Sequence, residues 1–409
     1  MFKRIYLAVA FCLEAVMAMN AQLAAELPGN DYSIDSSRIY NMYVGLENMN
    51  FIKDNEFSGS VMKGYTLPGL WLQPSVKYYP LSNVKLELGF RALIYDGAIK
   101  YPNLAYQDIA VWKGGQYQRG AHLLPMFRAQ VQLSNVQLVW GTLYSGSNHG
   151  LMVPLYDPEL DFSADPDLGF QVLVDSRRLH LDAWINWQSF VFRLDDHQEA
   201  FTVGLSMRTW LNPDNKKLKW YVPLQVLAQH RGGEIIDTDE RQVRTLMNGA
   251  LGVGAEWNVG RGLLRRFGAE CAALGYYQQS GTLWPFDSGM GAYVNAYAGL
   301  GDYFNVKLGY FYGHKFISMY GLPYFGCVST KNEGAVYDGM TTVFGSVEYR
   351  RPLGHGMTLG IWGDVYECHP GQMTSPDGTV SKSGSATNFA FGAYFKVDFD
   401  FHVWCSRKQ

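Results

Sequence analysis

The side chains best suited to chemistry gather in one long polar segment, "SGSNHGLMVPLYDPELDFSADPDLG", at 145–169. It carries Asp157, Glu159 and Asp161, while the cations Arg91 and Arg128 lie earlier in the chain. Carboxylates that face guanidinium groups across a water-filled passage create a transverse field, which sorts solutes by charge and dipole. The alternative is an ordinary acidic loop on the surface.

A second group, "LHLDAWINWQ" at 179–188, places Asp182, Trp184 and Asn186 at alternate positions. An indole face stacks on the apolar face of a sugar, while a carboxylate and an amide bind sugar hydroxyl groups. The alternative is a packing cluster that holds a loop against a wall of the protein.

Motifs for catalysis and metal binding are sparse. The nine histidines show no metal-ligand spacing, and the chain has no nucleophile elbow or phosphate-binding glycine loop. We therefore expect no enzymatic activity, no cofactor and no metal. One hydrolytic alternative stays open, in which His149 acts with Ser145 or Ser147, as in lipid-modifying enzymes of outer membranes.

The stretch at 179–188 also indicates the element that carries these groups. Its apolar residues recur at every second position, from Leu179 to Trp187, so they would spread around a helix but share one face of a strand. "NVKLELGFRALIYDG" at 83–97 alternates in the same way, with charged or small residues opposite a continuous apolar face. A lipid-facing wall with a polar interior produces this pattern.

Composition points to the same wall. Charged residues make up 17% of the chain and aromatic residues 15%, whereas a soluble protein has about 25% charged residues. Beyond the N-terminal segment no stretch is apolar enough for a spanning helix, and only helices and closed barrels satisfy their backbone inside lipid. We therefore predict an all-β, antiparallel transmembrane barrel. The net charge of -3, without a basic stripe, excludes nucleic acid as a partner.

About sixteen strands are expected, with short turns alternating strictly with long loops. This alternation places both chain ends in the periplasm and the long loops outside, and it disfavours a secreted sandwich or propeller. The expected strands span 38–50, 66–79, 83–95, 122–133, 136–143, 169–175, 179–188, 199–210, 218–229, 245–257, 267–277, 289–300, 305–313, 340–350, 357–366 and 388–403.

The chain ends and cysteines suggest a compartment outside the cytoplasm. Residues 1–21 have the basic start, apolar stretch and small residues of a secretory signal peptide, with 22–409 as the barrel. Cleavage after Ala18 is the competing site. Cys327 and Cys368 fall in neighbouring long loops, where an oxidising compartment permits a disulfide.

Four stretches resemble recurring segments of outer-membrane barrels from Bacteroidetes, and the resemblance covers much of 66–206. They are "TLPGLWLQPSVKYYP", "VWGTLYSGSNHGLMVPLYDPELDF", "DAWINWQSF" and "QEAFTVGLS". The resemblance implies a fold but brings no catalytic or ligand residues with it. More distantly, the layout is similar to that of sixteen-stranded porins.

These observations predict a porin-like channel in the outer membrane of a Gram-negative bacterium, through which small polar solutes diffuse passively. The alternative is a non-conducting receptor or a structural subunit of a larger outer-membrane assembly. The partners that we expect are outer-membrane lipids, the barrel-insertion machinery, small polar solutes or sugars, and a homo-oligomer or outer-membrane complex.

Overall fold

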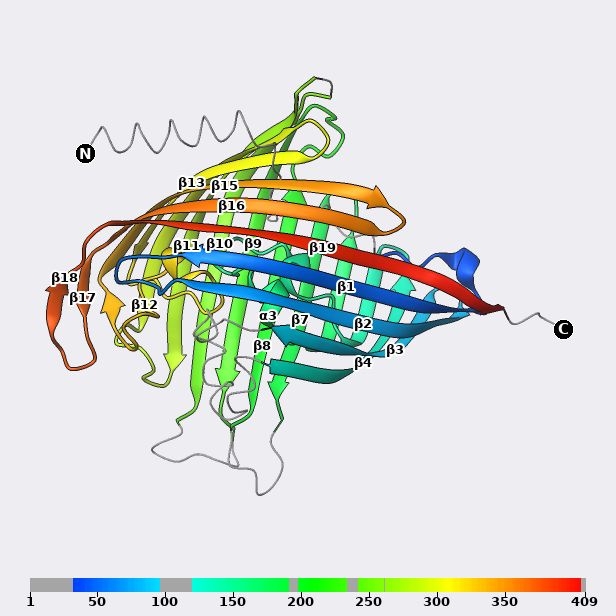
Figure 1. Cartoon of the computed structure of the whole chain (residues 1–409), viewed down its shortest axis with the longest axis horizontal. Helices are drawn as coiled ribbons and strands as arrows, with labels where there is room; N and C mark the ends of the chain where they lie inside the picture. The colour runs from blue at the N-terminus through cyan, green and yellow to red at the C-terminus, as the bar shows by residue number, and fades with distance from the viewer. Residues whose placement is uncertain (1–31, 96–119, 191–197, 234–241, 261, 406–409) are drawn as a thin grey trace.

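A closed barrel accounts for most of the chain. The computed structural model describes residues 32–95, 120–190, 198–233, 242–260 and 262–405, so the expected signal peptide lies outside the described residues. Sixteen antiparallel strands form the barrel, which closes where β1 pairs with β19 (Figure 1). The predicted fold class and strand number are confirmed.

The barrel strands are β1 (Asn41–Glu56), β2 (Tyr65–Leu81), β3 (Val84–Tyr95), β4 (Gly120–Leu133), β5 (Val136–Thr142), β6 (Leu168–Asp175), β7 (Leu179–Ser189), β8 (Ala200–Trp210), β9 (Leu218–Arg231), β10 (Arg244–Asn258), β11 (Leu264–Ser280), β12 (Ser288–Leu300), β13 (Phe304–His314), β15 (Gly339–Gly354), β16 (Met357–Pro370) and β19 (Ala386–Cys405). A separate small sheet joins β14 (Val336–Tyr337), β17 (Gln372–Thr374) and β18 (Val380–Lys382) in the long loops. No helix of the described residues is long and apolar enough to cross a membrane.

The alternation of side chains follows the two faces of the wall. In β4, Leu123 and Phe127 are exposed on the outside, whereas Met126 and Arg128 are buried toward the lumen. The predicted and observed strands overlap over the middle of each strand and differ mainly at the ends. Several strands extend further than expected at the long-loop end; for example, β1 continues to Glu56 and β11 to Ser280.

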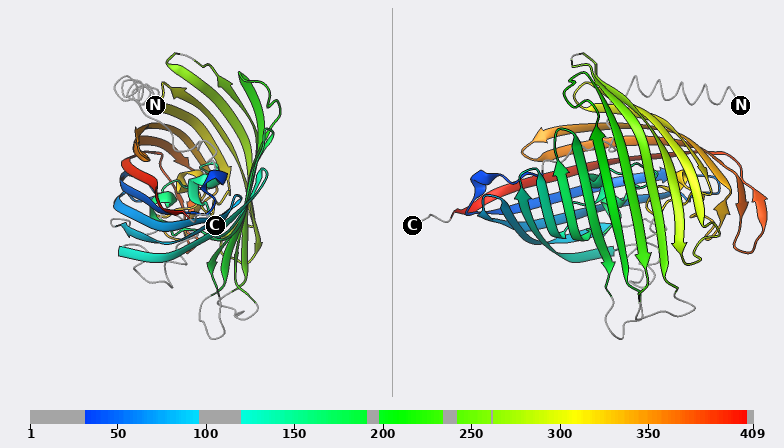
Figure 2. Two further views of the ribbon diagram at one scale, coloured as in Figure 1. Left: turned by 90° about the vertical axis from the view of Figure 1, so that its right-hand side faces the viewer. Right: turned by 180° about the vertical axis from the view of Figure 1, so that it is seen from behind.

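The lumen is not empty. The segment between β5 and β6, at 143–167, and the segment between β13 and β14, at 315–335, fold inside the barrel, as the view along it shows (Figure 2). The short helices η3 (Gly146–His149) and α3 (Leu160–Ser163) belong to the first, and η4 (Pro323–Phe325) to the second. The residues just before β1 enter the lumen from the short-turn end of the barrel. There Tyr32 stacks on Tyr144 with ring centroids 4.4 Å apart.

The wall is shortest at β5. Only residues Arg128–Leu133 of β4 pair with β5. On its other side, β4 pairs with β3 in a longer ladder, which runs from the pair of Gly120 with Tyr95 to the pair of Val131 with Val84. Gly141, with a φ of 95°, lies at the point where β5 leaves the wall and turns inward. The segment at 143–167 therefore enters the lumen partway up the wall.

Inward aromatic rings lie over glycines of the neighbouring strand. Gly204 of β8 pairs with Trp184 of β7, and a Cβ added at Gly204 would lie 2.1 Å from the indole ring. Gly254 against Tyr221 and Gly360 against Tyr394 repeat this arrangement. The missing side chain is what lets each ring lie flat against the wall.

We expect Gly204→Ala to destabilise the barrel by about 1–3 kcal/mol, because the new methyl group displaces the Trp184 ring from a packed position. Thermal unfolding in detergent micelles, followed by circular dichroism, measures the change. Gly275→Ala in β11 is the matched control, since an added Cβ there meets nothing within 4 Å. Equal unfolding temperatures for the two variants would rule out this packing role.

Candidate functional site

The segment at 143–167 is held at its base by side chains of the wall. Arg128 donates from Nε to the carbonyl of Thr142 (2.8 Å) and from Nη2 to that of Leu143 (3.2 Å), and Glu87 fixes its guanidinium at 2.8 Å. Gln171 of β6 exchanges two hydrogen bonds with the backbone of Tyr144 (3.0 and 3.1 Å). Side chains thus satisfy backbone groups where the strand ladder stops.

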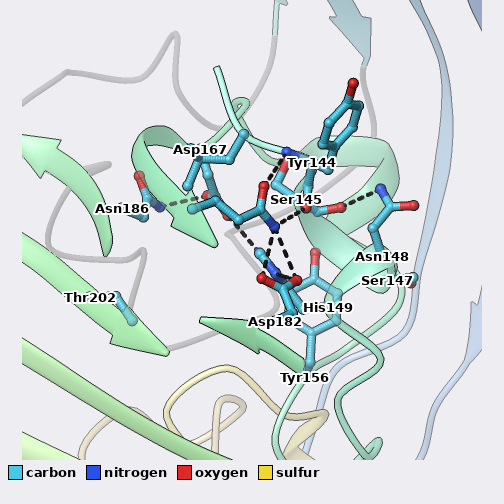
Figure 3. A network of polar contacts seen from close by, with 12 residues as sticks. Tyr144, Ser145, Ser147, Asn148, His149, Tyr156, Asp167, Asp182, Asn186 and Thr202 are labelled. Atoms are coloured by element: carbon cyan, nitrogen blue, oxygen red, sulfur yellow. Dashed lines mark hydrogen bonds and ion pairs between the residues drawn. The ribbon is translucent and has the colours of Figure 1, made fainter. Parts of the chain in front are cut away.

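Further along the segment, His149 contacts Asp182 of the wall (Figure 3). Its ring also stacks on Trp184 with centroids 3.6 Å apart and an interplanar angle of 8°. Nδ1 lies 2.8 Å from Asp182 and Nε2 lies 3.4 Å from Asp167. Burial alone would lower the pKa of His149, but the Asp182 charge and the two hydrogen bonds outweigh it and raise the pKa to about 9.

At neutral pH His149 is therefore an imidazolium that donates from both nitrogens. Gln171 donates to the other side of Asp182 at 2.9 Å, and Asn186 donates to Asp167 at 2.5 Å. Asp182, Trp184 and Asn186 thus come together around a loop histidine, with the indole face covered by the imidazole. None of the three lines the cavity that lies between the inward segments and the wall of β1–β5.

The second inward segment completes the filling of the lumen. Ser318 donates to the carbonyl of Pro154 at 2.5 Å, and the backbone N–H of Asp157 donates to the carbonyl of Tyr320 at 2.7 Å. Asn248 of β10 bonds to the same segment through Ile317 (2.8 Å) and Met319 (2.9 Å). Buried apolar side chains surround these bonds, among them Leu155, Leu160, Phe316, Leu322 and Phe325.

A cavity of about 710 Å³ remains between these segments and the wall of β1–β5, β13, β15, β16 and β19. Arg91, Arg128, Asp157, Glu159 and Asp161 all line it, so the structure brings five of the predicted residues to one space. Charges of both signs line the rest of its wall. The sequence analysis expected these acids to face the two arginines across a passage, and the structure places all five residues around one cavity.

Glu159 accepts three hydrogen bonds from side chains of the wall. Lys53 donates to it at 2.5 Å, Asn55 at 3.1 Å, and the Tyr65 hydroxyl also bonds to its carboxylate. These three partners come from β1 and β2, and sequence reasoning missed all of them. The alternation of side chains along β1 and β2 indicates that these three residues face inward. Only the folded structure shows that they contact a residue of the inward segment.

Asp157 lies beside this cluster, but only one of its two carboxylate oxygens has a hydrogen-bond partner among the described residues. Its Oδ1 accepts the backbone N–H of Glu159 at 3.0 Å, while its buried Oδ2 has no hydrogen-bond partner among the described residues. Burial raises the pKa of Asp157 to about 7, although the Lys53 charge opposes the shift. A carboxyl group of this kind exchanges a proton near neutral pH.

Arg91 and Asp161 occupy other parts of the lining. The Arg91 guanidinium lies 4.3 Å from the centroid of the Trp71 ring, and its Nε has no hydrogen-bond partner in the part of the chain that the structure describes. Asp161 accepts from the backbone and hydroxyl of Ser147 and from Tyr156. Within the described ranges, no group of three or more His, Cys, Asp or Glu side chains is placed to hold a metal.

The predicted disulfide is not formed. Cys327 and Cys368 are both buried free thiols. Cys368 belongs to strand β16 rather than to a loop, and its sulfur lies 3.8 Å from the Thr342 hydroxyl of the next strand. The pairing was inferred from loop positions, and the longer β16 strand removes that basis.

Two of three comparisons with known proteins return matches. The model of a family described as Lipid A 3'-O-deacylase-type matches residues 34–405. A search of curated proteins finds no match. Among solved structures, OmpT of Vibrio cholerae is 12% identical over 87% of this chain and 97% of its own, with a TM-score of 0.43. OprD of Pseudomonas aeruginosa is 9% identical over 90% and 99%, with a TM-score of 0.47.

The family corrects one expectation from the sequence. Its description names an enzymatic activity, which contradicts the prediction that the protein is not an enzyme. That prediction relied on motifs whose residues are close in sequence, whereas a barrel assembles sites from separate strands and loops. The barrel layout and the outer-membrane location are confirmed. With a match that spans nearly the whole chain, the protein is an outer-membrane β-barrel of Gram-negative bacteria that belongs to the Lipid A 3'-O-deacylase-type family.

Proposed function

We propose that the protein is an ester hydrolase that removes an acyl chain from the 3' oxygen of lipid A. The family description supplies the reaction class. The packed segments in the lumen support it, because they leave a cavity lined by charged and apolar side chains instead of an unobstructed pore. Ester hydrolysis needs a base to activate water and a positive group to stabilise the oxyanion.

The carboxyl group of Asp157 carries this proposal. It faces the cavity, its Oδ2 has no hydrogen-bond partner among the described residues, and its pKa of about 7 suits a general base at neutral pH. Asp157 takes a proton from water as the water oxygen attacks the ester carbonyl. The same proton then passes to the departing sugar oxygen, so that a carboxylic acid and an alcohol are formed from ester and water.

Arg91 is suited to stabilise the oxyanion. Its guanidinium lies over the Trp71 ring at the cavity wall, and its Nε is not used by another described group. Lys53 is less suited, because Glu159 already occupies its ammonium group. His149 is a poor base, since a protonated ring with both nitrogens bonded to carboxylates has no lone pair to offer.

Asp157→Asn is expected to lower kcat/KM for release of fatty acid from lipid A by at least about 100-fold, the range of general base catalysis. In the unsubstituted protein, kcat/KM should rise with pH through about 7, because the base must be deprotonated. The asparagine keeps the Oδ1 acceptor for the Glu159 N–H, so the unfolding temperature should not fall. Mass spectrometry of products across a pH series measures the rates.

Asp302→Asn is the control, since Asp302 lies in an exposed turn away from the cavity and forms an ion pair with Arg265. It should leave both the rate and its pH dependence unchanged. Full activity in Asp157→Asn, or a rate independent of pH between 5 and 9, would remove Asp157 from the reaction.

Passage of small polar solutes is the second candidate function. The lining of mixed charge on the walls of β1–β4, β13, β15 and β16 favours it, because such a surface holds water and ions. Passage would require the two inward segments to move. The packing of Phe316 and Phe325 against the wall opposes that movement.

Conductance in a planar bilayer separates the two functions. Because the inward segments fill the lumen, we expect the purified protein to give no discrete conductance steps at neutral pH. Shortening the segment at 315–335 should produce such steps by removing one of the two fillings. Steps of porin size in the full-length protein would support the second function.

A further inference from the structure

The large cavity has a second polar corner besides the part around Asp157. Glu348 and Arg350 of β15, Thr358 of β16 and Tyr394 of β19 line this corner, and the three strands lie side by side (Figure 1). Thr358 is the second residue of β16, so the corner lies toward the short turns, which outer-membrane barrels place in the periplasm. The proposed hydrolysis uses none of these four residues.

The carboxylate of Glu348 is held through only one of its oxygens. Its Oε1 accepts from the Tyr394 hydroxyl at 3.1 Å and from Nη2 of Arg350 at 3.3 Å, and Nε of Arg350 donates to the same hydroxyl at 3.1 Å. The Glu348 side chain is 1% exposed, and its Oε2 has no hydrogen-bond partner among the described residues. Because a buried acceptor without a partner is destabilising, this oxygen points to a donor that the chain itself does not supply.

The ring of Tyr394 gives the corner a flat aromatic surface. A Cβ added at Gly360 of the neighbouring strand would lie 2.1 Å from this ring, so one face of the ring lies against the wall. The side chain also lines the cavity, so its other face is turned toward the lumen. An aromatic face beside a carboxylate oxygen fits a sugar, whose ring stacks while one of its hydroxyl groups donates a hydrogen bond.

The charges of the cavity favour an uncharged ligand. Its lining contains ten acidic and eight basic side chains, so it has no excess of positive charge for a phosphate group. Within the corner, Arg350 already pairs with Glu348 at 3.3 Å. A hydroxyl group therefore gives Oε2 a donor without bringing a further charge into a buried place.

Two charged side chains connect the corner to solvent. Lys396 and Asp398 line the cavity, and their side chains are 37% and 50% exposed. They follow Tyr394 at alternate positions of β19, so they lie on the same inward face, nearer to the short turns. A water-soluble ligand therefore reaches the corner from the short-turn end, past groups that themselves bind hydroxyls.

We propose that this corner is a binding site for an uncharged sugar, which stacks on Tyr394 and donates a hydroxyl hydrogen bond to Oε2 of Glu348. The site goes beyond the proposed hydrolase function, because its ligand is water-soluble and its residues take no part in that reaction. It shares only the cavity with Asp157 and Arg91.

The class of ligand is tested with three small probes on the purified full-length barrel in detergent. Glucose, glucose 6-phosphate and methylamine are titrated in turn, and saturation-transfer NMR measures their binding. We expect saturable binding of glucose and an affinity for glucose 6-phosphate that is lower by at least about tenfold, because the acidic lining repels the phosphate. No saturable binding of glucose, or saturable binding of methylamine alone, overturns the proposal.

Glu348→Gln locates the site. The amide keeps an oxygen for Tyr394 and Arg350 but places an NH2 group where Oε2 was, and this group cannot accept a hydroxyl hydrogen. We expect the affinity for glucose to fall at least about tenfold, the usual loss for a hydrogen bond to a charged group.

Glu256→Gln in β10 is the matched control. Glu256 accepts from the Tyr297 hydroxyl and pairs with Arg266, much as Glu348 does with its partners, but it does not line the cavity. Its substitution should leave the affinity for glucose unchanged, and equal affinities in the two variants would overturn the proposal. If Glu348→Gln does not fold, Tyr394→Phe decides, since it keeps the ring and removes the hydroxyl that orients Glu348. An unchanged affinity in that variant would be equally decisive against the site.

This proposal and the hydrolase function fail in different ways. Release of fatty acid without saturable binding of glucose keeps the hydrolase and removes the sugar site. Binding of glucose that depends on Glu348, without any release of fatty acid, keeps the sugar site and removes the hydrolase.

Discussion

Backbone pairing inside lipid is the constraint on which the rest of this structure depends. Hydrocarbon offers no partners, so the wall must close, and β1 pairs with β19 along its whole length. The same constraint explains the side chains at the base of the lumen segment. Where β5 ends, Arg128 and Gln171 take over the bonds that a longer strand would have made.

The short β5 strand also determines what the lumen becomes. It sends the segment at 143–167 inward at mid-height, where His149 joins it to Asp182 and Asp167. A second segment packs on the first, and the space between them and the wall is a cavity with buried acids. The raised pKa of Asp157 follows from this burial, so the chemistry of the site depends on the filling of the barrel.

The wall could be predicted from the sequence because alternation is a local property. Sixteen strands, both faces of residues 179–188 and the order of short and long connections all follow from a period of two. The inward position of Arg91 and Arg128 followed from the same period. The contacts of the lumen could not be predicted, because they join residues far apart in the chain, such as Lys53 with Glu159 and Asn248 with Ile317. The enzymatic class that the family description names was missed because the sequence carries no local motif for catalysis.

The mass of lipid A in the outer membrane of Gram-negative cells that produce the protein tests the central claim most directly. Hydrolysis at the 3' oxygen predicts that lipid A from cells with the unsubstituted protein loses the mass of one acyl chain. Lipid A from cells with equal amounts of folded Asp157→Asn should keep its full mass. Unchanged lipid A in both, at equal levels of folded barrel, would contradict the assignment of a lipid A hydrolase to this lumen.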